Sequence, residues 1–581
     1  MPTSVDIKVF AFVVAALMAF AVAVPAWAAQ GEVTKDTSVS VSGLETGDKV
    51  NFIQVIKWVD GEGWAWVDGI KNDTTLPELT TITGKLEGDS ATLTSGTISA
   101  EHAGIIAKAA ANASLAATQV TESDGTATYT DAPAGLYYAQ VVPATADYLY
   151  NTIFVGADFS SDNSTNTIAA NTATLNAKEN ATAVAKKEQI TLTKDSDGET
   201  QNIKYDHEIG DVISFTITSK VPAYGDGYVN PQYSISDELE SNLVLSKADG
   251  STAAATDISV TIEGVTLESA DYEVTLSGTQ GFTVSLKQGA LEKVAALGSA
   301  KTITVTYNAK LTTLEGATVT EKTNKATVKF SNKPTDENSY SLIEDRTRHY
   351  SFSLDTSLLG SDEWETSELV KVGYKADGTE ITQKTNYSNG TKHGALEGAT
   401  FALFKTESEA NKAANGESYD TDDIFGTKES DADGKLDFAG LDATTYYLVE
   451  LSAPTGYIKD KTVHTVAITA EYETIPAGTY TNSDGILVKY DAYDVLKSYS
   501  VAIGGGATSS YTITNNKEAN ANDATAQSAS KTDQSTKLKN TQGTELPSTG
   551  GIGTTIFYVV GGALVVGAAV ALVSRRRMSA E

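Results

Sequence analysis

The sequence predicts an all-β protein built of several β-sandwich domains in tandem. Short runs rich in Thr, Val, Ile, Tyr and Phe alternate apolar with polar residues, as in 212–219 and 302–307. Such alternation is typical of half-buried antiparallel strands. Gly, Asp and Asn separate the runs, and an Ala-rich stretch over 101–118 predicts one or two short helices. Many short strands with frequent turns favour sandwiches.

The chain of 581 residues is too long for one core, and joints rich in turn residues divide it. We predict a first domain over 29–182, a second over 183–335 and a third over 336–518. An internal repeat relates the first domain to the third, since 124–138 resembles 433–447. The polar stretch 519–545 has no aromatic residue and is predicted to be a disordered linker.

Composition excludes several classes of function. The absence of cysteine excludes disulfides, thiolate metal sites and cysteine nucleophiles. A net charge of −32 excludes a nucleic-acid binder, because phosphate contact needs a basic face. The five histidines are scattered and no hydrolase or zinc-protease motif is present. We therefore expect no metal, no cofactor and no enzymatic function.

The N-terminus has the pattern of a secretory signal peptide over 1–28. An apolar run from Val9 to Val24 follows a charged start and leads into a site of small residues. Ala26 and Ala28 are the small residues of that site, which predicts cleavage after Ala28. The alternative is a membrane helix that is retained, but the run is short and ends at Pro25.

The C-terminus carries three features in a fixed order. A short motif precedes an apolar transmembrane segment over 551–574, and a basic tail over 575–581 follows it. The motif consists of Leu546, Pro547, Ser548, Thr549 and Gly550. This arrangement resembles the LPxTG cell-wall sorting signal of Gram-positive surface proteins. The resemblance implies that a sortase cuts between Thr549 and Gly550 and transfers Thr549 to an amine, so that membrane retention is transient.

Two further segments extend the resemblance to a family. Residues 446–457 resemble the E-box of sortase-assembled pilins, and residues 396–404 resemble the strand that begins their Cna B-type domains. With the LPSTG motif, the chain resembles a SpaA-type major (backbone) pilin. This resemblance implies tandem Ig-like β-sandwich domains of the Cna A and Cna B types in a secreted, peptidoglycan-anchored pilus that supports adhesion. It also implies sortase, other copies of the chain, accessory pilins and a host surface ligand as partners.

The resemblance further implies spontaneous isopeptide bonds, in which a buried lysine attacks an asparagine amide beside a buried acid. For the second domain it implies Lys194 and Asn332 as the bonded pair and Asp237 as the acid. Lys194 shares a strand face with Ile190 and Leu192, and Asn332 shares one with Val328 and Phe330.

For the third domain the resemblance implies Glu450 as the acid and Lys371 as the lysine. Asn515 shares a strand face with Tyr511 and Ile513 and is our choice for the asparagine. Three alternatives remain open, namely Lys405 and Lys375 for the lysine and Asn540 for the asparagine.

The first domain departs from this pattern, because aligning the repeat places Val141 opposite Glu450. We expect no internal bond there. The resemblance places the lysine that accepts the next subunit at the end of this domain, where Lys178 is our choice and Lys186 and Lys187 are the alternatives. A backbone pilin is thus the expected function. An accessory pilin or a monomeric wall-anchored adhesin is the alternative.

Overall fold

The computed structural model describes residues 37–59, 63–79, 100–133, 135–157, 181–196, 206–225, 228, 230–312, 319–354, 368–381, 384–385, 392–504, 508–514, 528–531, 536–543 and 565. Its contacts divide the chain into two compact units. Unit 1 comprises 1–142 and 152–186, and unit 2 comprises 143–151 and 187–581.

Unit 1 contains two sheets and a helix. The larger sheet has the order β3-β2-β6-β8, and β4 pairs with one part of β2; the smaller has the order β5-β1-β9. The strands are β1 (Thr37–Ser42), β2 (Lys49–Val59), β3 (Gly63–Trp66), β4 (Ala117–Thr121), β5 (Thr126–Ala132), β6 (Gly135–Val142), β8 (Ile153–Ala157) and β9 (Ala181–Val184). Helix α2 (Ala100–Asn112) confirms the predicted helix over the first part of 101–118, whose end lies in β4, and it buries Ile106 against the larger sheet.

The first part of unit 2 is a sandwich of two sheets. One sheet has the order β11-β12-β18-β14 with β15 beside β18, and the other contains β16-β17-β13-β19-β20. Their strands are β11 (Leu192–Ser196), β12 (Val212–Val221), β13 (Tyr233–Leu239), β14 (Leu243–Ser246), β15 (Ser259–Ile262), β16 (Tyr272–Leu276), β17 (Gly281–Leu286), β18 (Lys301–Leu311), β19 (Val319–Ser331) and β20 (Tyr340–Leu354). Alternation in β12 buries Ile213, Phe215 and Ile217 in the core between the sheets. Shorter elements are β7 (Tyr148–Tyr150), which pairs with β10 (Lys187–Gln189), the 3-10 helix η1 (Ala255–Asp257) and α3 (Gln288–Ala295).

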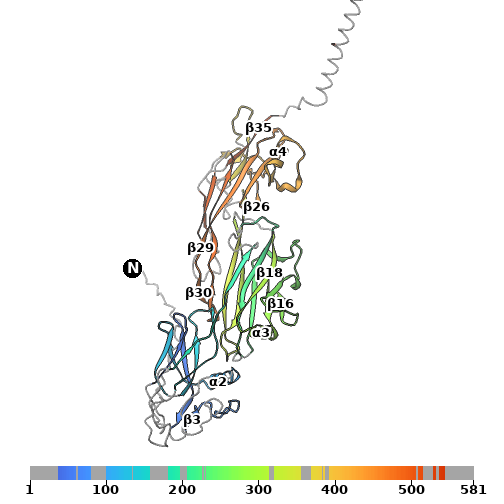
Figure 1. Cartoon of the computed structure of the whole chain (residues 1–581). Coiled ribbons are helices and arrows are strands. Elements are labelled where there is room, and N and C mark those ends of the chain that lie inside the picture. The colour runs from blue at the N-terminus through green and yellow to red at the C-terminus, as the bar shows by residue number, and fades with distance from the viewer. Residues whose placement is uncertain are drawn as a thin grey trace, which may run out of the picture. The chain divides into compact units, whose positions relative to one another are not determined.

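The second part of unit 2 has a core of its own. Its main sheet has the order β25-β24-β27-β29-β32-β33-β34, and a small sheet has the order β21-β35-β28. These strands are β21 (Leu369–Tyr374), β24 (Thr400–Phe404), β25 (Ile424–Glu429), β27 (Thr445–Ser452), β28 (Tyr457–Ile458), β29 (His464–Ile475), β32 (Tyr493–Ile503), β33 (Thr508–Thr514), β34 (Ser528–Lys531) and β35 (Thr536–Gln542). Helix α4 (Glu407–Asn415), the 3-10 helix η4 (Thr421–Asp423) and the strand pair β22 (Lys384–Thr385) and β23 (Lys392–His393) complete it. Figure 1 shows α4 and β35 at one end of unit 2, away from β16, β18 and α3.

Strand β20 belongs to both parts of unit 2. It pairs with β19 in the first part and also with β26 (Phe438–Leu441) and β31 (Leu487–Tyr490), which pairs with β30 (Gly478–Thr481). Ile343 lies in the first core, whereas Tyr350 and Phe352 lie in the second. The predicted boundary at 335 and 336 falls just before this strand, so the two domains have one strand in common.

The predicted disordered linker over 519–545 is wrong for part of its length. Strand β34 begins at Ser528, and β35 covers Thr536–Gln542 between β21 and β28. Thr536, Leu538 and Asn540 of β35 are buried in alternation with more exposed neighbours. The polar composition concealed this strand because two of its three buried residues are themselves polar.

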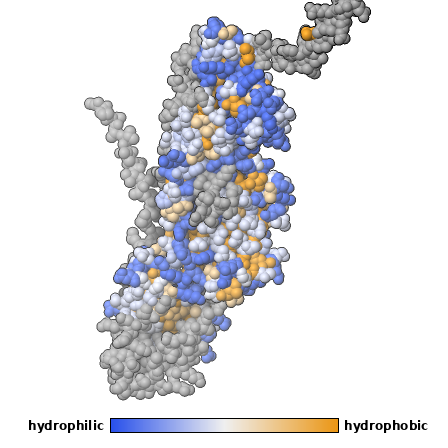
Figure 2. All heavy atoms as spheres, turned by 45° about the horizontal axis from the view of Figure 1, so that its top comes forward, coloured by the Kyte–Doolittle hydropathy of each residue, from blue (hydrophilic) through white to orange (hydrophobic). Residues whose placement is uncertain are grey.

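The described surface is mainly polar. In the coloured part of Figure 2, hydrophilic and intermediate residues cover most of the surface, and hydrophobic residues form small separate groups. The large apolar side chains that are exposed in the described ranges are Leu297, Ile458 and Val565. No helix within these ranges is both long and apolar enough to span a bilayer. The strand content and the paired sheets confirm the predicted all-β class.

Candidate functional site

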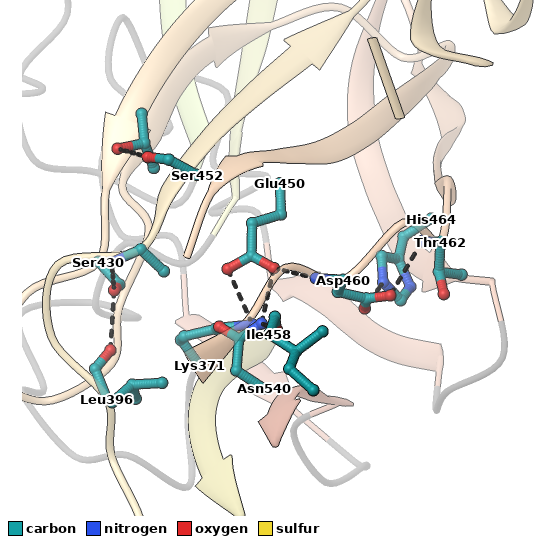
Figure 3. A network of polar contacts seen from close by, with 12 residues as sticks. Lys371, Leu396, Ser430, Glu450, Ser452, Ile458, Asp460, Thr462, His464 and Asn540 are labelled. Carbon is teal, nitrogen blue, oxygen red and sulfur yellow. Dashed lines mark hydrogen bonds and ion pairs between the residues drawn. The ribbon is translucent and has the colours of Figure 1, made fainter. Parts of the chain in front are cut away.

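Three charged or polar side chains meet inside the second part of unit 2. Lys371 lies on β21, Glu450 on β27 and Asn540 on β35. Strands β21 and β35 are parallel neighbours, and their register pairs Lys371 with Leu538 and Gly373 with Asn540. This register directs the lysine and the asparagine toward the same carboxylate, as Figure 3 shows.

Local backbone contacts fix the position of Lys371. Its backbone nitrogen donates to the carbonyl of Gly434 at 2.7 Å, and Gly434 has a φ of +78°. A Cβ at position 434 would come within 2.4 Å of the Lys371 carbonyl oxygen. Glycine is therefore required in this turn, both for its left-handed conformation and for the close approach to β21.

Glu450 contacts both potential reactants. Its Oε1 lies 3.4 Å from Lys371 Nζ, and its Oε2 accepts from Asn540 Nδ2 at 2.7 Å. Asn540 Nδ2 also donates to the Ile458 carbonyl at 2.8 Å, and Asp460 N donates to Glu450 Oε2 at 2.6 Å. Because a carbonyl oxygen only accepts, the Ile458 contact identifies the nitrogen of the Asn540 amide. The acid thus faces the amide nitrogen of Asn540, which is the leaving group of an isopeptide reaction.

Burial sets the charges at this site. Lys371 and Glu450 have no exposed surface and Asn540 is 1% exposed. Burial lowers the pKa of Lys371, and burial raises the pKa of Glu450, with each partner opposing the shift of the other. Both shifts favour a neutral amine beside a neutral acid, which is the state in which a lysine is nucleophilic.

A second group of the same kind lies in the first part of unit 2. Lys194 on β11 and Tyr307 on β18 come from one sheet, and Asp237 on β13 and Asn324 on β19 come from the facing sheet. Lys194 Nζ donates to Asp237 Oδ2 and, at 2.6 Å, to the Tyr307 hydroxyl. Tyr307 donates to Asp237 Oδ1 at 2.7 Å and accepts from Asn324 Nδ2 at 2.8 Å.

This second group is also sealed from water. Lys194, Asp237, Tyr307 and Asn324 are each 3% exposed or less. Burial lowers the pKa of Lys194, and burial raises the pKa of Asp237. Lys194 Nζ also lies 5.1 Å from the centre of the Phe215 ring, so apolar groups complete its surroundings. The arrangement repeats the lysine, acid and asparagine of the site around Glu450.

The structure brings Lys194 and Asp237 together but places Asn332 elsewhere. Asn332 is half-buried, and its side chain bonds Ser341 at 2.9 Å and Ser339 at 2.6 Å. Asn324 takes the predicted position, on the same strand face and eight residues earlier. Eight residues of a strand cover about 26 Å, which puts Asn332 far from the lysine.

Several predicted residues lie outside the described ranges or away from the two sites. Lys371 and Glu450 meet with Asn540, the alternative, whereas Asn515 lies outside the described ranges. Lys375 is exposed, and Lys405 is an exposed residue that pairs with Glu208 at 2.7 Å. Outside the described ranges also lie the signal peptide with Ala26 and Ala28, Lys178, the motif from Leu546 to Gly550 and the basic tail. Of the apolar segment, only Val565 is described.

The described part of unit 1 contains no buried lysine, and Val141 is 7% exposed. Lys186 is exposed and Lys187 is partly exposed, with its Nζ 5.4 Å from the centre of the Tyr148 ring. The ranges that the structure describes hold no group of three or more His, Cys, Asp and Glu residues that could bind a metal ion.

Comparison with known proteins agrees with this architecture. Residues 378–482 match the SpaA family, described as a prealbumin-like fold domain, and residues 538–579 match an LPXTG cell wall anchor motif. The trypsin-resistant surface T6 protein of Streptococcus pyogenes serotype M6 is 26% identical over 498 residues, covering 78% of this chain and 81% of the relative. The solved T6 backbone pilin of the same serotype has a TM-score of 0.50 at 16% identity, covering 88% of this chain and 99% of that one.

The prealbumin-like domain, the anchor motif and the T6 relative define a surface protein of the pilin class, anchored in the cell wall. The SpaA domain and the LPXTG anchor motif indicate a structural surface pilin, and the fold is similar to that of the T6 backbone pilin. Sortase processing and polymerisation from copies of the same chain follow from this class.

Proposed function

We propose that this backbone subunit is stabilised by two internal isopeptide bonds, Lys194–Asn324 and Lys371–Asn540, with Asp237 and Glu450 as the acids that promote them. The observation that carries the proposal is the burial of two lysine–acid–asparagine groups inside separate cores of unit 2. A buried lysine and acid without a reaction would be costly, because charges removed from water lose solvation.

The same arrangement supports the chemistry of bond formation. The Lys Nζ lone pair attacks the Asn Cγ, the Cγ–Nδ2 bond breaks, and ammonia leaves. The amine must be neutral for this attack, and burial of both lysines favours that form. Fixed strands hold the reactants together, which replaces a bimolecular encounter by an intramolecular one.

Intact mass of the ectodomain 29–545 tests the two bonds. Each bond releases one ammonia, so we expect a mass about 34 Da below the sequence mass, from the stoichiometry of about 17 Da per bond. Peptide mapping should recover Lys194 joined to Asn324 and Lys371 joined to Asn540. Unmodified Asn324 or Asn540 peptides in full yield would contradict the assignment.

We further propose that Thr549 of one copy is joined to a lysine ε-amine of the next, with Lys178 as the acceptor. The resemblance to pilins places the acceptor at the end of the first domain, and Lys186, a little further along the chain, is exposed. Repetition of one head-to-tail contact gives an open filament. Accessory pilins with sorting signals of their own would use the same chemistry, and a host ligand would bind the assembled pilus.

Co-expression with a cognate sortase tests the acceptor. Lys178→Ala should abolish the ladder of high-mass products, whereas Lys186→Ala should retain it. A ladder that survives Lys178→Ala and disappears with Lys186→Ala or Lys187→Ala would move the assignment to that residue. Single-copy products with the unchanged chain would favour the alternative, an accessory pilin or a monomeric adhesin.

A further inference from the structure

The hydroxyl of Tyr307 lies at the centre of the site around Lys194. Its oxygen is 2.6 Å from Lys194 Nζ, 2.8 Å from Asn324 Nδ2 and 2.7 Å from Asp237 Oδ1. One oxygen thus contacts the attacking nitrogen, the leaving nitrogen and the acid. Such a position is suited to moving a proton between the two nitrogens.

The two sites of unit 2 reach their asparagines in different ways. Glu450 contacts the lysine with one oxygen and Asn540 Nδ2 with the other. Asp237 has a side chain one methylene shorter, and it contacts Lys194 while Asn324 Nδ2 donates to Tyr307 instead. The Tyr307 hydroxyl therefore contacts Asn324 as the second carboxylate oxygen of Glu450 contacts Asn540, and it connects Asn324 to Asp237.

We propose that Tyr307 is a catalytic residue for the Lys194–Asn324 bond and carries a proton from the nucleophile to the leaving group. This inference rests on the proposed function of that site. After Lys194 Nζ attacks Cγ of Asn324, Nδ2 becomes a basic amine nitrogen, and the Tyr307 hydroxyl turns from Asp237 toward it. One Nζ proton then passes to the Tyr307 oxygen as the Tyr307 proton passes to Nδ2. The Cγ–Nδ2 bond then breaks, ammonia leaves, and Tyr307 is again a neutral phenol.

The surroundings of Tyr307 favour a transfer in which both protons move together. Phe215 stacks on its ring at 5.2 Å between centroids, and Phe282 meets it edge-on at 4.9 Å. These contacts fix the hydroxyl within the apolar core. Burial also raises the pKa of Tyr307 well above its usual value, which disfavours a free phenolate and favours replacement of the proton as it departs.

The variant Tyr307→Phe removes the hydroxyl and retains the ring. We expect the ectodomain variant to lack the Lys194–Asn324 cross-link and to retain Lys371–Asn540, which gives a mass deficit of about 17 Da instead of about 34 Da. The retained bond reports that the remainder of unit 2 has folded. Formation of both bonds in Tyr307→Phe, in the same yield and time as in the unchanged chain, would overturn the proposal.

A double variant separates proton transfer from packing. Asp237→Glu combined with Tyr307→Phe adds the missing methylene to the acid, which then resembles Glu450 and can reach Asn324 directly. We expect this double variant to recover the cross-link that the single variant lacks. Two results would assign Tyr307 a packing role and overturn the proposal. One is a double variant that still lacks the Lys194–Asn324 cross-link, and the other is a Tyr307→Phe variant that lacks both cross-links. An unchanged chain without the Lys194–Asn324 cross-link would instead contradict the proposed function.

Discussion

At the scale of single residues, burial decides which protonation state each lysine holds. Lys194 and Lys371 lose the solvation that favours an ammonium ion, while Asp237 and Glu450 lose the solvation that favours a carboxylate. Each acid can therefore take the proton from its lysine. After the bond forms, the buried amide carries no charge, so the reaction removes the cost that burial imposed.

Glu450→Gln should prevent the Lys371–Asn540 bond. A glutamine cannot take the lysine proton, although its size and its contact with Asn540 are similar. We expect the ectodomain to regain about 17 Da and to retain the Lys194–Asn324 cross-link, because that site has its own acid. Glu429→Gln, at an exposed position of β25, is the matched control and should leave both bonds. A complete Lys371–Asn540 bond in Glu450→Gln would show that the acid is dispensable.

Asp345 should make stability depend on pH. It is 8% exposed, and burial raises its pKa to about 7, although it accepts from the backbone nitrogens of Lys194 and Arg346. Because the folded-state pKa is above the unfolded value, the unfolded chain releases the proton first as pH rises. The free energy of unfolding should therefore fall between about pH 4 and pH 7, on the order of 4 kcal/mol at most.

Chemical denaturation at pH 4 and pH 7.5 measures this effect. Asp345→Asn cannot titrate at this position and should show a smaller decrease between the two pH values. Asp484→Asn, at an exposed turn position, should behave as the unchanged chain. An equal decrease in all three proteins would exclude Asp345 as the titrating group.

At the scale of elements, the alternation of apolar and polar residues predicts which face of a strand a side chain lies on. It does not predict which residues of the neighbouring strands that side chain lies opposite. The face shared by Val328 and Phe330 is buried and carries Asn324, whereas Asn332 lies just beyond the end of β19 and is half-buried. Which of them meets Lys194 depends on the register between strands, which no local pattern specifies. Tyr307 was missed for the same reason, because its partners come from three other strands.

Strand β35 shows a different limit of the sequence. Leu538 is the only large apolar residue of 519–545, so the hydrophobic pattern is too weak to indicate a strand. Asn540, one of its two buried polar residues, bonds Glu450 and the Ile458 carbonyl in place of water. A polar site residue thus stands where an apolar residue would mark a buried strand position, so the hydrophobic pattern does not reveal the strand.

Leu538→Ala should destabilise the second part of unit 2. Leu538 has no exposed surface and belongs to its core. Removal of such a side chain costs about 2–5 kcal/mol. We expect a lower midpoint in thermal unfolding and a lower yield of the Lys371–Asn540 bond, because β35 carries Asn540. Gln542→Ala, at an exposed position of the same strand, is the control. Equal midpoints for both variants would contradict a structural role of β35.

At the scale of the whole molecule, the two proposed bonds lie in series along the chain. Each joins a strand near the start of its domain to one near the end, β11 to β19 and β21 to β35. In a polymer linked through Thr549, tension enters and leaves each subunit along its backbone. A cross-link between early and late strands would transmit that tension without unfolding the chain between them.

Single-molecule pulling on the ectodomain tests this transmission. The unchanged chain should not release the segments within the two cross-links. Lys194→Ala should release about 130 additional residues, a contour length of about 470 Å, and Lys371→Ala about 170 residues, or about 610 Å. Each variant breaks one bond, so the other segment should stay closed in each experiment. Release of both lengths by the unchanged chain would mean that neither bond bears load.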